Sequence, residues 1–256
     1  MLTFCLPFII SGSSGLRGTV SSRAIDASLL LAVLVGGTMM VTVGELTRSP
    51  GAGNVSRSIA LLGALVAIDA TLRLVPSFLG ASPIFALIVV VGYVFGSRFG
   101  FAMGALTLLL SAAITAGVGP WLPFQMLCAG WVGLAAGWLP HTTSERREVA
   151  TLTLFGMVAG FAYGAVMNLY SWPFAAPDLN SDTGLYWSPS LTFVESMERY
   201  GSFYITTSFL HDASRAIATA AILLVSAAPV MRLLGRFKAR ATWTMSVPAQ
   251  GTSTHT

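Results

Sequence analysis

The chain has 256 residues, of which 54% are hydrophobic and 9% are charged, and its formal net charge is +4. This composition is typical of a membrane protein and excludes an ordinary soluble domain, which carries far more Lys and Glu. The basic residues stand at the ends of apolar segments and form no basic face, so we expect no nucleic-acid partner.

Apolar segments of about 20 residues, the length that crosses a bilayer as a helix, recur along the chain. The first is followed by residues 47–57, which contain Pro50, Gly51 and Gly53 and are predicted to be a linker. The sequence thus predicts an all-α membrane protein: a six-helix transmembrane bundle, residues 58–240, with an additional N-terminal transmembrane helix, residues 27–46. The predicted spans are Ala27–Leu46, Ser58–Val75, Pro83–Ser97, Phe99–Val118, Phe124–Pro140, Val149–Trp172 and Phe203–Arg232.

Both ends of the chain are predicted to lie outside these spans. Residues 1–26 include an apolar segment, Leu2–Ile10, that is too short to cross a bilayer and lacks the basic residues of a secretory signal. We interpret it as the remnant of a further helix, truncated at its start. Residues 241–256 are predicted to form a disordered tail.

The basic residues predict the orientation, because cytoplasmic loops carry an excess of Lys and Arg. A cytoplasmic C-terminus gives the stronger asymmetry, so we expect a multi-pass protein of the plasma membrane oriented in this way. Thr142–Glu148 then becomes a solvated inner turn, and Pro173–Ser202 becomes a long outer loop. The inner residues are Arg48, Arg57, Arg98, Arg146, Arg147, Arg232, Arg236, Lys238 and Arg240, and the outer ones are Arg17, Arg23, Arg73 and Arg199.

Small residues recur at four-residue spacing, a pattern that lets transmembrane helices approach closely. Gly156, Gly160 and Gly164 are interpreted as packing residues within the bundle. A second face lies on the first core helix beside the linker, where another protein could reach it. Packing and a partner interface both remain open for that face, which consists of Ala60, Gly63, Ala64 and Ala67.

Enzyme motifs are missing from the sequence. The only lysine is Lys238, so the chain has no Gly-x-x-x-x-Gly-Lys-Ser/Thr phosphate loop and is not expected to use ATP itself. The three histidines are dispersed, and the two cysteines cannot build a thiolate metal site within one chain. We expect no catalytic residues, no metal and no cofactor, and an enzyme is the least favoured class.

Polar side chains inside apolar segments are costly and therefore indicate function. Asp69 and Arg73 lie four residues apart near the outer end of a predicted helix, on one face and able to pair. His211, Asp212 and Arg215 share one face of the last predicted helix. Arg215 is expected about 20 Å along this helix from Ser202, near the middle of the membrane. Either a satisfied ion pair or an outward-open pocket for a small solute explains these groups. The candidate pocket residues are Asp69, Arg73, Trp121, Gln125, Asn168, Trp172, His211, Asp212 and Arg215.

The stretch Val118–Trp131 adds rigidity and flat aromatic surface near these polar groups. Pro120 and Pro123 stiffen it, and Gln125 supplies a donor and an acceptor at a helix start. We predict a wall or lid over a ligand. An aromatic belt at the membrane interface would explain Trp121 and Trp131 but neither the prolines nor the glutamine.

These features together resemble the substrate-binding S components of energy-coupling factor transporters, most closely actinobacterial ones, some of which are associated with cobalamin uptake. The resemblance covers Ser58 to about Arg240. It implies a membrane subunit that captures a vitamin or related micronutrient outside the cell and docks through its first core helix on a membrane-embedded coupling subunit served by two cytoplasmic ATPases. The matching motifs are Ala60-x-x-x-Ala64, Gly92-Tyr93-Val94-Phe95-Gly96, Gly119-Pro120-Trp121-Leu122-Pro123-Phe124-Gln125-Met126, and Asp212 with Arg215 before a basic tail.

Two other classes of function remain open at this point. An autonomous secondary transporter would couple a small organic solute to protons or sodium through its buried acids, although no inverted repeat is visible. A non-transport membrane anchor or sensor would use the same polar residues only for packing.

Overall fold

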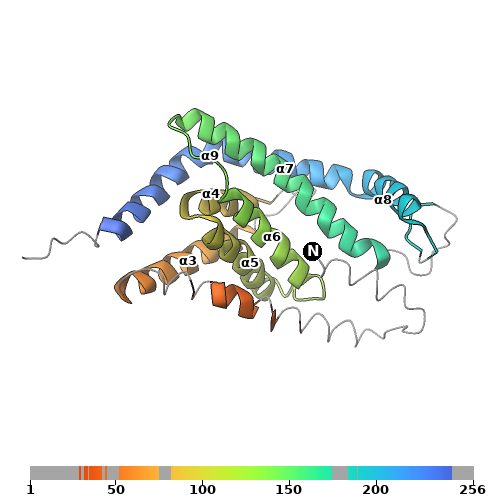
Figure 1. Cartoon of the computed structure of the whole chain (residues 1–256), viewed down its shortest axis with the longest axis horizontal. Helices are drawn as coiled ribbons and strands as arrows, with labels where there is room; N and C mark the ends of the chain where they lie inside the picture. The colour runs from red at the N-terminus through yellow and green to blue at the C-terminus, as the bar shows by residue number, and fades with distance from the viewer. Residues whose placement is uncertain are drawn as a thin grey trace, which may run out of the picture.

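The computed structural model describes residues 52–74, 82–174, 184–188 and 190–243, with a few positions between 29 and 44. Every regular element in these ranges is helical (Figure 1). The helices are α3 (Ala52–Leu72), α4 (Ile84–Phe95), α5 (Ser97–Ile114), α6 (Leu122–Ala136), α7 (Glu145–Ser171), a 3-10 turn (Trp172–Phe174), α8 (Phe193–Thr207) and α9 (Phe209–Trp243).

The predicted helical membrane class is confirmed, and all six core helices have a counterpart. Within the described ranges, three helices are long and apolar enough to cross a bilayer: α5, α7 and α9. Two others, α4 and α6, are apolar but shorter. Figure 1 shows α7 and α9 running side by side along one side of the molecule, with α3 to α6 on the other.

The N-terminal part of the chain departs from the prediction at the linker. Helix α3 begins at Ala52, inside the segment 47–57 expected to be non-helical. Pro50 and Gly51 precede this start, and the single Gly53 within the first turn weakens a helix without ending it. Of the predicted helix 27–46, residues 35–41 are described and helical, whereas segment 1–26 lies outside the described residues.

Helices α4, α5 and α6 are held together by glycines that bring their backbones into contact. A Cβ on Gly100 would overlap the carbonyl oxygen of Gly133, and a Cβ on Gly133 would overlap that of Gly100. A Cβ on Gly92 of α4 would also overlap the Gly133 carbonyl oxygen, and Gly104 faces the backbone of Ala129. Such close approach maximises van der Waals contact in the absence of a hydrophobic driving force between helices.

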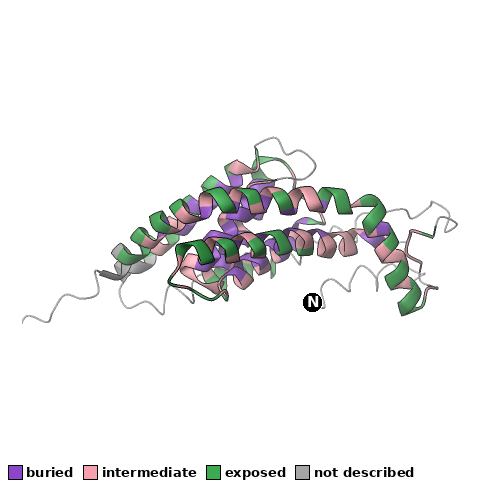
Figure 2. Ribbon diagram, turned by 90° about the horizontal axis from the view of Figure 1, so that it is seen from above, coloured by how far each residue is buried: buried purple, intermediate pink, exposed green. Residues whose placement is uncertain are grey.

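Helix α7 packs along α9 through the glycines predicted to be packing residues. The position of a Cβ on Gly160 falls against the backbone of Ala216, and Gly156 faces the Leu223 side chain. The interpretation of this series as packing within the bundle is therefore confirmed. Figure 2 shows exposed residues along the outer sides of both helices and buried residues toward the bundle.

The predicted long outer loop, Pro173–Ser202, contains a helix that the sequence analysis missed. Helix α8 starts with a capping box in which Thr192 and Glu195 satisfy each other's backbone N–H groups. Hydrogen bonds from the backbone and side chain of Thr192 lower the pKa of Glu195. The cap stabilises this helix start as long as Glu195 is ionised, so its contribution falls as the pH drops through that lowered pKa.

The last predicted span is wrong at both ends, since α9 runs from Phe209 to Trp243 rather than from Phe203 to Arg232. The break at Ser208 follows hydroxyl side chains that compete for backbone groups, as Thr207 Oγ1 donates to the Phe203 carbonyl at 2.7 Å. Beyond Arg232 the helix continues through good helix formers. The predicted tail 241–256 therefore begins as helix, and residues 244–256 lie outside the described ones.

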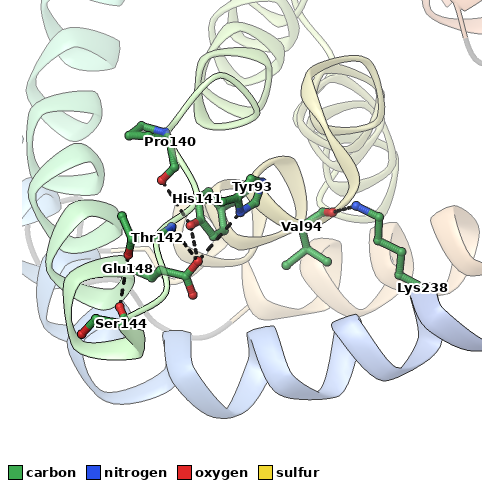
Figure 3. Close-up of polar contacts among 8 residues, drawn as sticks. All are labelled: Tyr93, Val94, Pro140, His141, Thr142, Ser144, Glu148 and Lys238. Carbon is green, nitrogen blue, oxygen red and sulfur yellow. Dashed lines mark hydrogen bonds and ion pairs between the residues drawn. The ribbon is translucent and has the colours of Figure 1, made fainter.

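The ends of α4 and α9 meet the start of α7 in a polar junction (Figure 3). Glu148 accepts hydrogen bonds from the Tyr93 hydroxyl at 2.6 Å and from the Thr142 backbone at 3.3 Å. Lys238 Nζ donates to the Val94 carbonyl at 2.5 Å, and Arg232 Nε lies 3.5 Å from Glu145 Oε2. The run Thr142–Glu148 is thus not a simple solvated turn: its second half is the first turn of α7, and its last residue organises this junction.

Replacing Gly133 with Ala is expected to destabilise the bundle, because the new methyl group would overlap the Gly100 carbonyl and force α5 and α6 apart. Overpacking of this kind costs about 1–3 kcal/mol. Thermal unfolding of the purified protein in detergent measures the loss. The matched control is Gly235→Ala, because nothing lies within 4 Å of the added Cβ there. Equal melting temperatures for the two variants would contradict the backbone contact.

Candidate functional site

A buried ion pair lies where the C-terminal part of α7 meets the first turns of α9. Arg215 Nη1 donates to Asp212 Oδ1, and both side chains are almost completely buried. Asn168 Nδ2 donates to the other carboxylate oxygen at 3.4 Å, while Ser208 Oγ donates to Asn168 Oδ1 at 3.0 Å. The structure thus brings together three of the predicted site residues and adds Ser208.

Gly164 provides the space that the Asp212 carboxylate occupies. A Cβ at this position would fall on the carboxylate atoms of Asp212. The third member of the α7 glycine series therefore does more than pack helices, because it seats an acidic side chain between them. Asp212 is held on all sides, as expected for a charge that has been removed from water at a high desolvation cost.

Three tyrosines that the sequence analysis did not select surround the ion pair. The guanidinium carbon of Arg215 lies 5.4 Å from the centre of the Tyr163 ring, a cation–π distance. Tyr200 donates its hydroxyl to the Ala165 carbonyl, and the Tyr204 hydroxyl faces Asp212. Burial, followed by the nearby Asp212 charge, raises the pKa of Tyr204 to about 12, so this hydroxyl remains a neutral donor. The spacing of Tyr200 and Tyr204, one turn apart, is the signal that could have found them.

Trp172 lies against the aromatic side chains of α8, beside the tyrosines that surround the ion pair. Its indole Nε1 donates to the Leu185 carbonyl at 3.0 Å, and its ring lies 5.3 Å from that of Tyr200 in an edge-on arrangement. Phe203, the buried residue of α8, also contacts Trp172. The segment predicted to be a long outer loop thus contacts Trp172 through the aromatic side chains of α8 and through the Leu185 carbonyl.

Two residues of the predicted wall lie at the beginning of α6. Trp121 is exposed, and its ring packs against Gly119. Gln125 is half-buried one turn further on, next to Phe124, whose ring stacks on Tyr170 of α7 at 4.1 Å. The structure therefore does not bring Trp121 to the ion pair. His211 is exposed on α9 beside the pair and outside its hydrogen bonds, within the described residues.

Asp69 lies in the last turn of α3 and Arg73 directly after it, and the two do not form the pair that their spacing allows. Asp69 is completely buried, and neither of its carboxylate oxygens has a hydrogen-bond partner among the described residues. The same is true of Arg73 Nη1. A spacing of four permits contact but does not ensure it, because the rotamers of both side chains depend on their neighbours.

The assumption that one helix runs from Ser202 to Arg215 is wrong, because α8 ends at Thr207 and α9 begins at Phe209. Counted from Phe209, where α9 begins, Arg215 is six residues along, which places it about 9 Å from the start of the helix. The expected distance from Ser202 presupposed a helix that continues through Ser208. The ion pair therefore lies in the N-terminal third of α9, beside the C-terminal part of α7.

The small-residue face of α3 carries no neighbour in the described structure. Ala60, Gly63, Ala64 and Ala67 are all exposed, and nothing lies within 4 Å of a Cβ added at Gly63. Packing within the bundle therefore does not explain this pattern among the described residues. No group of three or more His, Cys, Asp or Glu side chains in that part of the chain could hold a metal ion.

Comparison with known proteins identifies one family. The family model described as "ECF transporter, substrate-specific component" matches residues 57–227. Neither the curated proteins nor the solved structures contain a match to the chain.

Replacing Arg215 with Ala is expected to cost about 3–5 kcal/mol of folding stability, because it leaves the buried Asp212 carboxylate uncompensated. Adding Asp212→Asn in the same chain should recover much of this loss, since the remaining amide carries no charge. Chemical unfolding in detergent measures both, with Arg236→Ala, at an exposed position of the same helix, as the control. Unchanged stability of Arg215→Ala would show that the pair does not hold α9 in place.

Proposed function

The chain belongs to the family of substrate-specific components of energy-coupling factor transporters, and from this premise we propose its topology, its substrate pocket and its docking face. As such a component it is the substrate-capture subunit of an importer and is not an enzyme. The family implies that it works with a transmembrane coupling subunit and with ATPases. It is a multi-pass membrane protein.

We propose that α3, α4, α5, α6, α7 and α9 each cross the membrane, with the segment 27–46 as an additional span. The polar junction of Glu148 and Lys238 supports a cytoplasmic C-terminus, because it gathers the ends of α4 and α9 and the start of α7 at one end of the bundle. Basic residues of this end include Arg146, Arg147 and Arg236. The ion pair and α8 then face the outside.

The pocket that we propose lies between α3, α6, α7, α8 and α9 at this outer end. Its support is a set of buried polar and aromatic side chains in an otherwise apolar bundle, an arrangement typical of a small-molecule site. The substrate class proposed from the resemblance is a vitamin or related micronutrient, with cobalamin as one candidate. The proposed lining residues are Asp69, Arg73, Trp121, Gln125, Asn168, Trp172, His211, Asp212 and Arg215.

A binding screen tests this function. The purified full chain is unfolded thermally in the presence of each of a panel of water-soluble vitamins, cobalamin included. A captured substrate should stabilise the protein by about 2.7 kcal/mol at 100 times its Kd. Uptake of that compound into vesicles should require ATP, the coupling subunit and the ATPases. Uptake by the chain alone, driven by a proton or sodium gradient, would instead show an autonomous secondary transporter.

The exposed small-residue face of α3 is proposed to bind the coupling subunit. Ala64→Leu should therefore prevent co-purification with the coupling subunit and abolish uptake, because the larger side chain keeps the helices apart. Substrate binding by the isolated chain should not change. The control is Ala162→Leu at an exposed position on α7. Normal assembly of Ala64→Leu would exclude this face as the docking site.

A further inference from the structure

Four polar side chains at and beside the interface of α3 and α5 have buried atoms that lack hydrogen-bond partners within the described structure. They are the Asp69 carboxylate on α3, Nη1 of the half-buried Arg73 directly after α3, and the Thr107 and Ser111 hydroxyls on α5. Thr107 and Ser111 are four residues apart and share one face of α5, and Arg73 follows Asp69 by four residues, one position beyond the end of α3. Thr107 is the polar side chain of α5 next to Asp69, without the geometry of a hydrogen bond, and Asp69, Thr107 and Ser111 are all completely buried.

Such a set is expensive to maintain if it serves only packing. A buried ionised group without a partner destabilises a protein by several kcal/mol, and a membrane offers no water in its core to replace the missing bonds. Asp212 shows how this chain satisfies a buried charge: it bonds to Arg215, accepts from the Asn168 amide, and occupies the space left by Gly164. Asp69 and Arg73 Nη1 have no such hydrogen-bond partners among the described residues.

The open groups adjoin the pocket proposed above. Arg73 lies within electrostatic range of the Tyr163 hydroxyl, and the ring of the same tyrosine faces the Arg215 guanidinium. Tyr163 is thus a common neighbour of Arg215 and Arg73. The ion pair of Asp212 and Arg215 and the unpartnered groups at the end of α3 both occur near the end of the bundle where α7 ends and α9 begins.

The charges of these groups restrict what could satisfy them. When Asp69 is ionised, it and Arg73 together carry no net charge, and the pair formed by Asp212 and Arg215 is neutral as well. A metal cation would gain from Asp69 and be repelled by the guanidinium one turn away. A solute with a large net charge of either sign would leave one of the two groups uncompensated.

We propose that Asp69, Arg73, Thr107 and Ser111 form a substrate subsite for a solute that is neutral overall and bipolar. An N–H or ammonium group of the solute donates to Asp69, and a carboxylate or carbonyl oxygen accepts from Arg73. The two groups on the solute are separated by about 5–6 Å, the distance between side chains one helical turn apart. The hydroxyls of α5 complete the bonding. This inference rests on the proposed capture function and names the class of substrate.

The test compares the affinity of the full chain for whichever vitamin of the panel stabilises it with that of three variants. Asp69→Asn and Arg73→Gln should each weaken binding at least tenfold, and Thr107→Val should weaken it severalfold. Thr153→Val is the matched control, because this hydroxyl on α7 is also buried and unpartnered; it should bind within twofold of the parent. A derivative of the compound with its acidic or carbonyl oxygen blocked should bind the parent and Arg73→Gln equally.

The ligand-free protein gives a second, independent readout. Because Asp69 has no partner before the substrate binds, Asp69→Asn should raise the melting temperature or leave it unchanged. A side chain that holds the fold together would lower it. A lower melting temperature, or failure to fold, would therefore overturn the proposal.

The outcomes separate this inference from the proposed function. If no compound stabilises the parent, the capture function fails, and the melting temperature of Asp69→Asn still decides the role of the cluster. If a compound binds the parent and either Asp69→Asn or Arg73→Gln binds it within twofold, capture stands and the bipolar subsite is wrong. A bound compound that carries a net charge of two or more also overturns the subsite.

Discussion

The close approach of helix backbones at glycine is the interaction on which the rest of this structure depends. Lipid provides no hydrophobic drive between apolar helices, so they associate through van der Waals contact. Gly100 and Gly133 remove the side chains that would separate α5 from α6, and Gly160 does the same for α7 and α9. The short helices α4 and α6 are thereby held in place, and the polar residues at the end of the bundle acquire fixed neighbours.

Gly164 connects this packing to the chemistry of the site. It continues the glycine series of α7, yet the space that it leaves is filled by the Asp212 carboxylate rather than by a helix backbone. One residue type thus serves two purposes along a single helix face. The result is a closed ion pair between α7 and α9 with three tyrosines around it.

Asp212 with Arg215 and Asp69 with Arg73 have similar spacings but opposite states. Asp212 and Arg215 bond directly, and Asn168 occupies the second carboxylate oxygen. The Asp69 carboxyl oxygens and Arg73 Nη1 are buried without hydrogen-bond partners among the described residues. In a membrane subunit that captures a solute, the hydrogen-bonded pair of Asp212 and Arg215 suits a structural role. Asp69 and Arg73 would gain hydrogen bonds from a ligand, which would lower the cost of their burial.

Hydrophobic composition and segment length were sufficient to predict the helical membrane class, the six core helices and the polar positions, because these properties are local and periodic. Contacts between distant segments decided the rest. The existence of α8 depends on its capping box, and the break before α9 follows the hydroxyl–backbone bond of Thr207. Whether Arg73 reaches Asp69, and whether Gly164 faces a backbone or a carboxylate, depends on rotamers that only the surrounding helices determine.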